Sequence, residues 1–293
     1  MNILDDLKLQ YKIGGSAQKL LYWNVGLFAI PYVVFAVLTL FGININFLSY
    51  LSLSSNPVDL LWKPWSIITY AFFHSGFLHL LFNMLVLNFS SRLFLTYFTQ
   101  KQFLNLYFTG TIFAGIIYMI SYYLLPSLSS VDVSLVGASG AIMAILFAVA
   151  TYSPLMEVRL LLIGNVKLWH IAFFLIVIDL IQLPLENTGG HLAHLAGALF
   201  GYIYIKQLQR GSDIGSWFSF LMDKFVNLFS RKESTPFKKV HRNYMPKPEK
   251  TVSKIVTKDK TQKQIDEILD KISQSGYDSL TKEEKEFLFK AGK

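Results

Sequence analysis

The chain has 293 residues, of which 53% are hydrophobic and 16% are charged, and its mean hydropathy is +0.41. This composition argues against a single water-soluble domain, in which about 25% of the residues are charged. From Lys206 onward the chain holds 19 of its 27 Lys and Arg residues and 12 of its 19 Asp and Glu residues. The sequence therefore predicts an apolar membrane body followed by a basic, water-facing tail. The absence of cysteine excludes disulfides, thiolate metal sites and cysteine nucleophiles.

Six stretches are apolar enough to be membrane-spanning helices, which need roughly 20 mostly apolar residues to cross about 30 Å of hydrocarbon. They are Leu21–Phe41, Ile67–Phe89, Leu104–Leu125, Ser139–Tyr152, Leu168–Leu183 and His191–Ile205. The fourth and sixth are short. We expect their polar ends to face a protein-lined cavity, because loop backbone exposed to lipid is not tolerated. The predicted fold class is an all-α, polytopic six-helix membrane bundle.

The orientation in the membrane follows from basic residues in the short loops. The N-terminal stretch and the second and fourth predicted loops are basic, through Lys8, Lys12, Lys19, Arg92, Lys101, Arg159 and Lys167. In the alternate loops, Lys63 is the only basic residue. Both termini are therefore predicted to be cytoplasmic, in the cell (inner) membrane. Met1–Ala17 is too polar for a cleavable signal peptide, so the first span is expected to remain as an anchor.

Composition divides the chain into five parts. They are a cytoplasmic segment (1–20), the six-helix domain (21–209), an amphipathic segment (210–233), a basic flexible linker (234–260) and a small helical appendage (261–293). The amphipathic segment would lie on the anionic leaflet or pack under the body. In the appendage, Leu280-Thr281-Lys282-Glu283-Glu284 predicts a capped second helix.

Gly137-Ala138-Ser139-Gly140 opens the fourth predicted span and offers a candidate nucleophile. Gly137 and Gly140 leave room for a substrate backbone and for close helix packing. The alternative is that these residues form only a small-residue helix contact. A serine hydroxyl attacks well only when a base accepts its proton, so the motif becomes informative only with a partner.

His194, one turn into the sixth span, is the candidate base, because imidazole titrates near physiological pH. Gly197 and Gly201 follow at i+3 and i+7, and are expected to pack closely against the fourth helix. A glycine packing face with an incidental histidine is the alternative. It leaves unexplained why a costly polar group is kept in lipid.

The second span contributes His74, His79 and Asn83, which the topology places in the same outer layer as Ser139 and His194. His79 and Asn83 are spaced i, i+4 and share a helical face. With the Ser139 backbone N–H they could form an oxyanion hole, whose donors are worth several kcal/mol. Hydrogen bonding between helices is the alternative, and for Asn83 alone it is favoured.

Asp179, late in the fifth span, is a functional-site hypothesis because acids are rare in membrane helices. A structural or gating role is favoured over orienting His194. A zinc site at His191 and His194 would need a third ligand, and no His-Glu-x-x-His motif is present. An aspartyl protease would need a second intramembrane aspartate. No metal or other cofactor is therefore expected.

These motifs together resemble the rhomboid family of intramembrane serine proteases. The matching residues are His74-x4-His79-x3-Asn83, Gly137-Ala138-Ser139-Gly140 and Ala193-His194-x2-Gly197-x3-Gly201, in family order over roughly residues 20–205. The resemblance implies a Ser139–His194 dyad without a third acidic member, and an oxyanion hole with His79 and Asn83. It also implies that single-pass membrane proteins are cut within or beside their transmembrane segment, with products released on the outer side. The predicted partners are these substrates and membrane lipid, and no nucleic acid.

One departure lies in the first loop, where Trp65 is followed by Ser66 instead of the arginine common in the family. Lys63 is a candidate substitute for its bracing role. A non-catalytic rhomboid-like protein that binds membrane clients is the main alternative function, although such relatives lose the serine or the histidine. A small transporter would require inverted repeats and a polar path across the membrane, whereas the polar residues here gather on one side.

Overall fold

The computed structural model of the chain describes residues 2–128, 132–160, 163–229 and 253–291. The chain divides into two compact units, Met1–Arg231 and Lys232–Lys293. The first unit holds a helical bundle, and the second holds a pair of helices.

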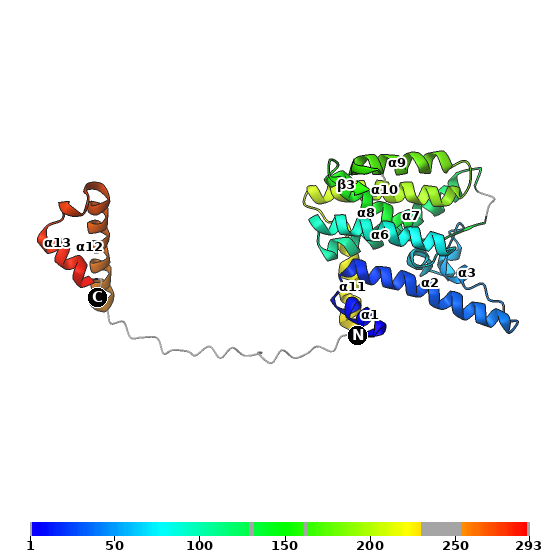
Figure 1. Cartoon of the computed structure of the whole chain (residues 1–293), viewed down its shortest axis with the longest axis horizontal. Helices are drawn as coiled ribbons and strands as arrows, with labels where there is room; N and C mark the ends of the chain where they lie inside the picture. The colour runs from blue at the N-terminus through cyan, green and yellow to red at the C-terminus, as the bar shows by residue number, and fades with distance from the viewer. Residues whose placement is uncertain (1, 129–131, 161–162, 230–252, 292–293) are drawn as a thin grey trace. The chain divides into compact units, whose positions relative to one another are not determined.

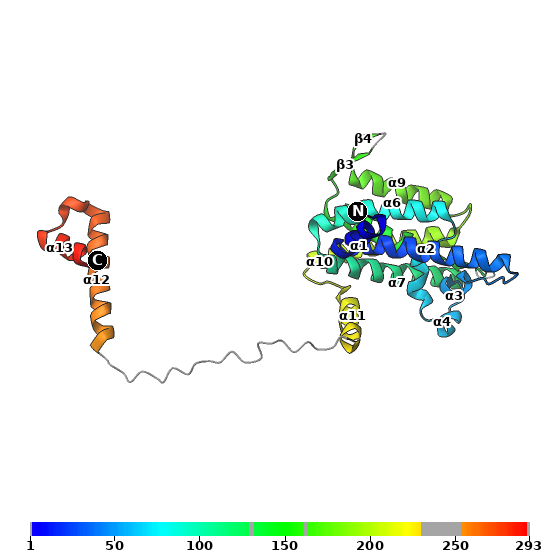
Figure 2. The same ribbon diagram turned by 60° about the horizontal axis from the view of Figure 1, so that its bottom comes forward.

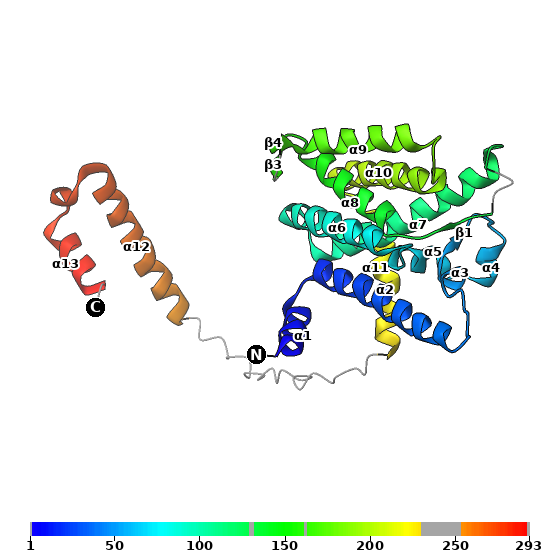
Figure 3. The ribbon, with the colours of Figure 1, turned by 45° about the vertical axis from the view of Figure 1, so that its right-hand side comes forward.

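Within the described residues, the bundle contains six helices, one of which is central. They are α2 (Ser16–Leu40), α6 (Phe77–Tyr97), α7 (Gln100–Leu124), α8 (Ser139–Tyr152), α9 (Leu168–Gln182) and α10 (Thr188–Gln209). The central helix α8 packs against α6, α7, α9 and α10, and its residues Gly140–Ala150 are all buried. Figures 1 and 3 show α9 on one side of the bundle and α2 on the other. The predicted all-α membrane-type bundle is confirmed.

Length and apolar composition divide five of these helices into two groups. Within the described residues, α2, α6 and α7 are long and apolar enough to cross a membrane, while α8 and α9 are shorter apolar helices. The 14 residues of α8 extend about 21 Å, less than the hydrocarbon thickness. Because α8 packs against four neighbouring helices, its polar start faces a protein-lined cavity, as the sequence predicted.

The predicted start of the second span is wrong. Ser66–Thr69 and Tyr70–Phe72 form a short helix (α5) and a 3-10 turn (η1), and α6 begins only at Phe77. Gly76, the residue before α6, is fully extended with φ −175°. The apolar run therefore bends before it enters the long helix, and His74 lies in the connecting loop instead of on the helix. Hydrophobicity alone does not reveal this break, although Ser-Gly is a sequence signal for a turn.

The segment before α8 is held by backbone pairing. Strand β1 (Leu53–Ser54) pairs antiparallel with β2 (Ser134–Leu135), and the Gly137 N–H donates to the carbonyl of Tyr70 at 2.9 Å. These contacts fix the turn that leads into Ser139. A second antiparallel pair, β3 (Glu157–Leu160) and β4 (Gly164–Lys167), connects α8 to α9 (Figure 2).

The first loop contains the short helices α3 (Leu48–Leu51) and α4 (Asp59–Trp62). Lys63 Nζ donates to the Ser49 carbonyl at 3.0 Å, and Trp65 Nε1 donates to the Tyr50 carbonyl at 2.8 Å. Lys63 therefore does brace this loop, while Ser66 is buried. The candidate substitution of a lysine for the arginine is consistent with these contacts.

Two further helices belong to the first unit. The predicted N-terminal segment contains α1 (Ile3–Ile13), and the amphipathic segment contains α11 (Ser216–Phe229). One face of α11 packs on α7, where Phe218 stacks on Phe108 with ring centroids 4.6 Å apart. Lys101 Nζ and Asp223 Oδ2 form an ion pair at 3.0 Å beside it. One face of α11 therefore packs against the helical bundle, and its other face, which is apolar, is exposed.

The second unit consists of α12 (Ser253–Ser275), the turn η2 (Tyr277–Ser279) and α13 (Lys282–Ala291). The predicted linker therefore ends too late, because α12 begins inside it; residues 234–252 lie outside the described residues. Ser253–Lys260 is polar, but lysine is a good helix former. Ile268 and Leu280 are buried between the helices.

The predicted capped helix is present in this unit. The Thr281 N–H donates to Glu284 Oε2 at 2.8 Å, and the Glu284 N–H donates to Thr281 Oγ1 at 3.3 Å. The Glu284 carboxylate also accepts from Lys271 Nζ at 2.9 Å. The hydrogen bond from the Thr281 N–H, followed by the Lys271 ammonium, lowers the pKa of Glu284.

Candidate active site

Ser139 is the first residue of α8, and Ala138 is its N-cap. The first N–H groups of a helix have no partner within the helix, and the helix dipole favours negative charge there. The N–H groups of Ser139 and Gly140 are therefore suited to face an anion beside the hydroxyl.

A cavity of about 750 Å³ brings the predicted residues together. Four helices line it, namely α6, α8, α9 and α10. Its polar lining residues are His79, Asn83, Ser139, Asp179, Gln182, His191 and His194. The remaining lining residues are apolar and include Phe82, Met143 and Ile178. Segments more than a hundred residues apart in sequence thus meet in one apolar cavity with a polar end.

His79 lies against the turn that precedes the serine. Its Nδ1 is 3.0 Å from Ser75 Oγ. A Cβ added at Gly137 would lie 2.8 Å from both Cε1 and Nε2 of the His79 ring, and 3.8 Å from Ser139 Oγ. Gly137 also has φ +122°, in a region that favours glycine. Glycine at this position therefore lets the His79 ring approach the serine hydroxyl.

Asn83 is buried one turn further along α6. Its Nδ2 donates to the His79 carbonyl at 2.9 Å. Since the amide carries two N–H groups, one donor remains for a ligand in the cavity. The two suggested roles of Asn83, helix hydrogen bonding and oxyanion binding, are compatible.

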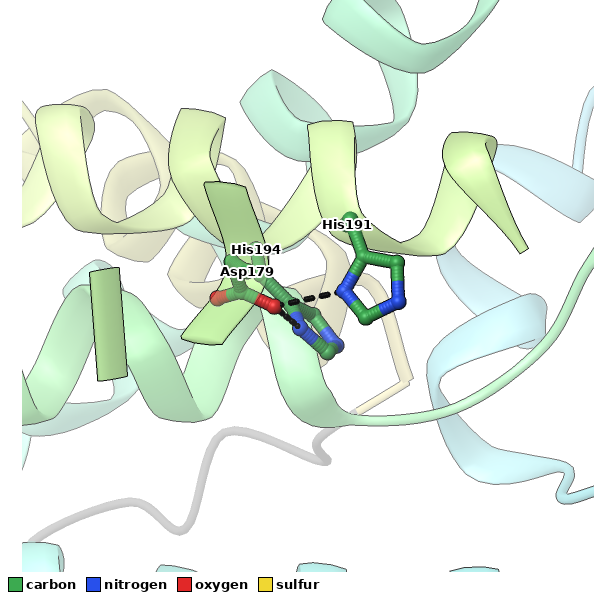
Figure 4. A group of neighbouring side chains, drawn as sticks. All are labelled: Asp179, His191 and His194. Carbon is green, nitrogen blue, oxygen red and sulfur yellow. Dashed lines mark hydrogen bonds and ion pairs between the residues drawn. The ribbon is translucent and has the colours of Figure 1, made fainter. Parts of the chain in front are cut away.

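His194 is held by Asp179, and so is His191. Asp179 Oδ1 is 2.9 Å from His194 Nδ1 and 2.7 Å from His191 Nδ1. Figure 4 shows both rings directed at this one oxygen. The contacts fit both suggested roles of Asp179, the favoured structural one and the orientation of His194. The sequence marks Asp179 as an unusual acid in an apolar helix, but it does not show that α9 packs on α10.

The same three residues could hold a metal ion. Their ligand atoms all lie within 4.8 Å of one another. The sequence offered no third ligand through a His-Glu-x-x-His motif, whereas the fold brings the Asp179 carboxylate of α9 within reach of both histidines. Three protein ligands are the number found in catalytic zinc sites. In the structure, however, both Nδ1 atoms lie at hydrogen-bond distance from the carboxylate oxygen, which is typical of a hydrogen-bonded cluster.

The glycines of α10 make the predicted close contact with α8. A Cβ at Gly197 would collide with the Gly140 carbonyl, and one at Gly201 would collide with the Ala144 carbonyl. A Cβ at Gly140 would lie 2.8 Å from the Ala114 Cβ of α7. The glycines therefore set the spacing between the helices that carry Ser139 and His194.

Ser139 and His194 face the same cavity from these two helices. Among the residues that the structure describes, no hydrogen bond joins their side chains. Catalytic hydrogen bonds are often long without substrate and tighten in the substrate complex. The arrangement is thus compatible with proton transfer between them.

His74 supports the site from outside the cavity. It is fully buried, and its ring packs edge-on against His79 with centroids 5.1 Å apart. Its carbonyl accepts from the Tyr32 hydroxyl at 2.8 Å, which ties the loop to α2. The expected supporting role of His74 agrees with this position, although the residue precedes the helix.

Comparison with known proteins adds independent information about this bundle. The chain is similar to the presenilin-associated rhomboid-like protein A, mitochondrial, of Danio rerio, with 36% identity over 143 residues. This match covers 46% of the chain and 35% of the relative. Residues 256–290 match a family of unknown function, DUF6576. Residues 61–210, which include every candidate site residue, match the Rhomboid domain family. The chain belongs to the rhomboid family.

Proposed function

We propose that the protein is an intramembrane serine endopeptidase that cleaves transmembrane segments of single-pass membrane proteins. One observation carries the proposal: Ser139, His194, His79 and Asn83, from three separate helices, line one cavity. Membership of the rhomboid family supports it.

In the proposed reaction, Ser139 Oγ attacks the carbonyl carbon of the scissile peptide bond, and His194 Nε2 takes the hydroxyl proton. The carbonyl oxygen becomes an oxyanion, stabilised by the Ser139 N–H, His79 and Asn83. His194 then gives the proton to the leaving amine as the C–N bond breaks. A water, deprotonated by His194, hydrolyses the acyl-enzyme and regenerates Ser139.

The cavity lining supports a transmembrane substrate. Six of its lining side chains, from α6, α8 and α9, are apolar, so an apolar segment that enters from the membrane would still contact apolar groups. We also propose that the protein lies in the cell (inner) membrane with cytoplasmic termini, because the basic loops favour that orientation. The site would then face the outer side, from which water enters.

Cleavage in proteoliposomes tests the proposal. The wild type and Ser139→Ala would be reconstituted with single-pass model substrates whose transmembrane segments contain small residues and glycine, and products would be mapped by mass spectrometry. Ser90→Ala is the control, because Ser90 is a buried serine of α6 outside the cavity. Cleavage by the wild type and Ser90→Ala but not by Ser139→Ala supports the proposal. Capture of substrates without cleavage would favour the client-binding alternative.

A further inference from the structure

The contact between Asp179 and the two histidines joins helix α9 to helix α10. Asp179 precedes His191 by 12 residues and His194 by 15. The exposed fractions of the side chains are 7% for Asp179, 10% for His191 and 25% for His194. Asp179 is therefore a carboxylate withdrawn from solvent whose Oδ1 has two imidazole partners.

This contact determines which nitrogen of His194 carries the proton. An ionised carboxylate oxygen only accepts hydrogen bonds, so with Asp179 ionised the His194 Nδ1 carries a hydrogen. In the neutral ring the lone pair is then on Nε2, which is the atom that can accept the Ser139 proton. When His194 becomes an imidazolium during the reaction, the nearby carboxylate stabilises its charge.

We propose that Asp179 is the positioning residue of the Ser139–His194 pair, holding His194 in the Nδ1–H tautomer that leaves Nε2 free to act as the base. This inference rests on the proposed protease function and adds a third member to the dyad. It contrasts with a purely structural role, in which Asp179 only ties α9 to α10.

Replacing His191 distinguishes the positioning role of Asp179 from the purely structural one. His191 binds the same oxygen at the shorter distance of 2.7 Å, so it contributes to the tie between the helices as much as His194 does. In the proposed reaction, however, His191 transfers no proton, and its contribution is to hold Asp179 from the second side. Replacing His191 should therefore weaken the tie and leave the tautomer of His194 unchanged.

The first test measures kcat and KM in proteoliposomes for the wild type, Asp179→Asn and His191→Gln, with a cleaved single-pass model substrate. Glutamine loses more rotamer freedom than imidazole when it is held in place, so this variant is expected to weaken the tie to Asp179. We expect Asp179→Asn to lower kcat by about 100-fold or more, with KM changed less than about threefold, as for other triads that lose the carboxylate. We expect His191→Gln to keep kcat within about fivefold. Equal losses of kcat in the two variants would overturn the proposal, as would an Asp179→Asn kcat within about threefold of wild type.

A second measurement does not depend on activity. The chain has six histidines, so nitrogen-15 labelling of histidine gives a small set of ring signals, and His194→Ala identifies the signal of His194. We expect a proton on Nδ1 of His194 in the wild type and in His191→Gln. In Asp179→Asn we expect loss of this preference, since the amide N–H can donate to Nδ1. A wild-type His194 with its proton on Nε2 would overturn the inference.

The two measurements distinguish the failure of this inference from the failure of the proposed function. A wild type that cleaves nothing would contradict the protease proposal. An active wild type whose kcat and His194 tautomer do not depend on Asp179 would contradict only the positioning role. Metal analysis of the purified protein supplies a further criterion. A stoichiometric transition metal that is lost in Asp179→Asn would overturn the hydrogen-bonded arrangement in favour of a metal site.

Discussion

Gly197 of α10 lies directly against the backbone carbonyl of Gly140 of α8. Gly140 directly follows Ser139, and Gly197 lies three residues after His194. The contact is between backbones, so no side-chain rotation can make room for a larger residue. The distance between the proposed nucleophile and base is thus set by the absence of a Cβ atom.

Gly197→Ala is expected to destabilise the protein and lower its activity. The added methyl group would collide with the Gly140 carbonyl, and overpacking of this kind costs about 1–3 kcal/mol. Gly26→Ala is the matched control, because Gly26 lies in α2 with nothing near its Cβ position. We expect the control to be neutral or slightly stabilising. Thermal unfolding in detergent checks both, and equal unfolding midpoints for the two variants would contradict the packing role.

Gly137→Ala is expected to affect catalysis beyond its cost in backbone strain. Alanine at φ +122° is strained, and its Cβ would displace His79 from the serine. Gly211→Ala is the control, since Gly211 has φ +86° and open space around its Cβ position. We expect about 1–2 kcal/mol of destabilisation at either position, and a fall in kcat of at least about tenfold for Gly137→Ala alone. If both variants kept full kcat, the close approach of His79 would have no catalytic importance.

His79→Ala is expected to lower kcat by about 100- to 1000-fold, the usual loss when an oxyanion donor is removed. For Asn83→Ala we expect a smaller loss, because one of its N–H groups is already occupied by the His79 carbonyl. Asn88→Ala, on the same helix but outside the cavity lining, provides the control. Rates of substrate cleavage check this order. Wild-type kcat in His79→Ala would exclude an oxyanion role for His79.

Acid is expected to weaken α13 through Glu284. The pKa of Glu284 is lowered in the folded unit, so the ionised carboxylate stabilises the folded state. This stabilisation is present above the ordinary glutamate pKa of about 4.3 and is lost as the pH falls through the lowered folded pKa. Circular dichroism of a peptide spanning residues 253–293 checks this between about pH 5 and pH 2. Glu284→Gln removes the titrating group, so its loss of helix in this range should be smaller. Identical pH profiles for both peptides would contradict the assignment.

Much of this site could be predicted from the sequence because its parts lie in short motifs. The spacing of Ser139 within its glycines and of Gly197 and Gly201 after His194 predicted which helices pack closely. The contact of Asp179 with His194 could not be read in this way, because it joins two helices and depends on their relative rotation. The loop position of His74 was missed because its apolar neighbours mask the break at Gly76.

The most direct test of the central claim is covalent labelling of the purified full-length protein with a serine-directed fluorophosphonate, followed by peptide mass spectrometry. We expect one adduct, on Ser139, in the wild type and in Ser90→Ala, and its loss in Ser139→Ala and in His194→Ala. Labelling of similar intensity in the wild type, Ser139→Ala and His194→Ala would contradict the assignment of Ser139 as nucleophile and His194 as base.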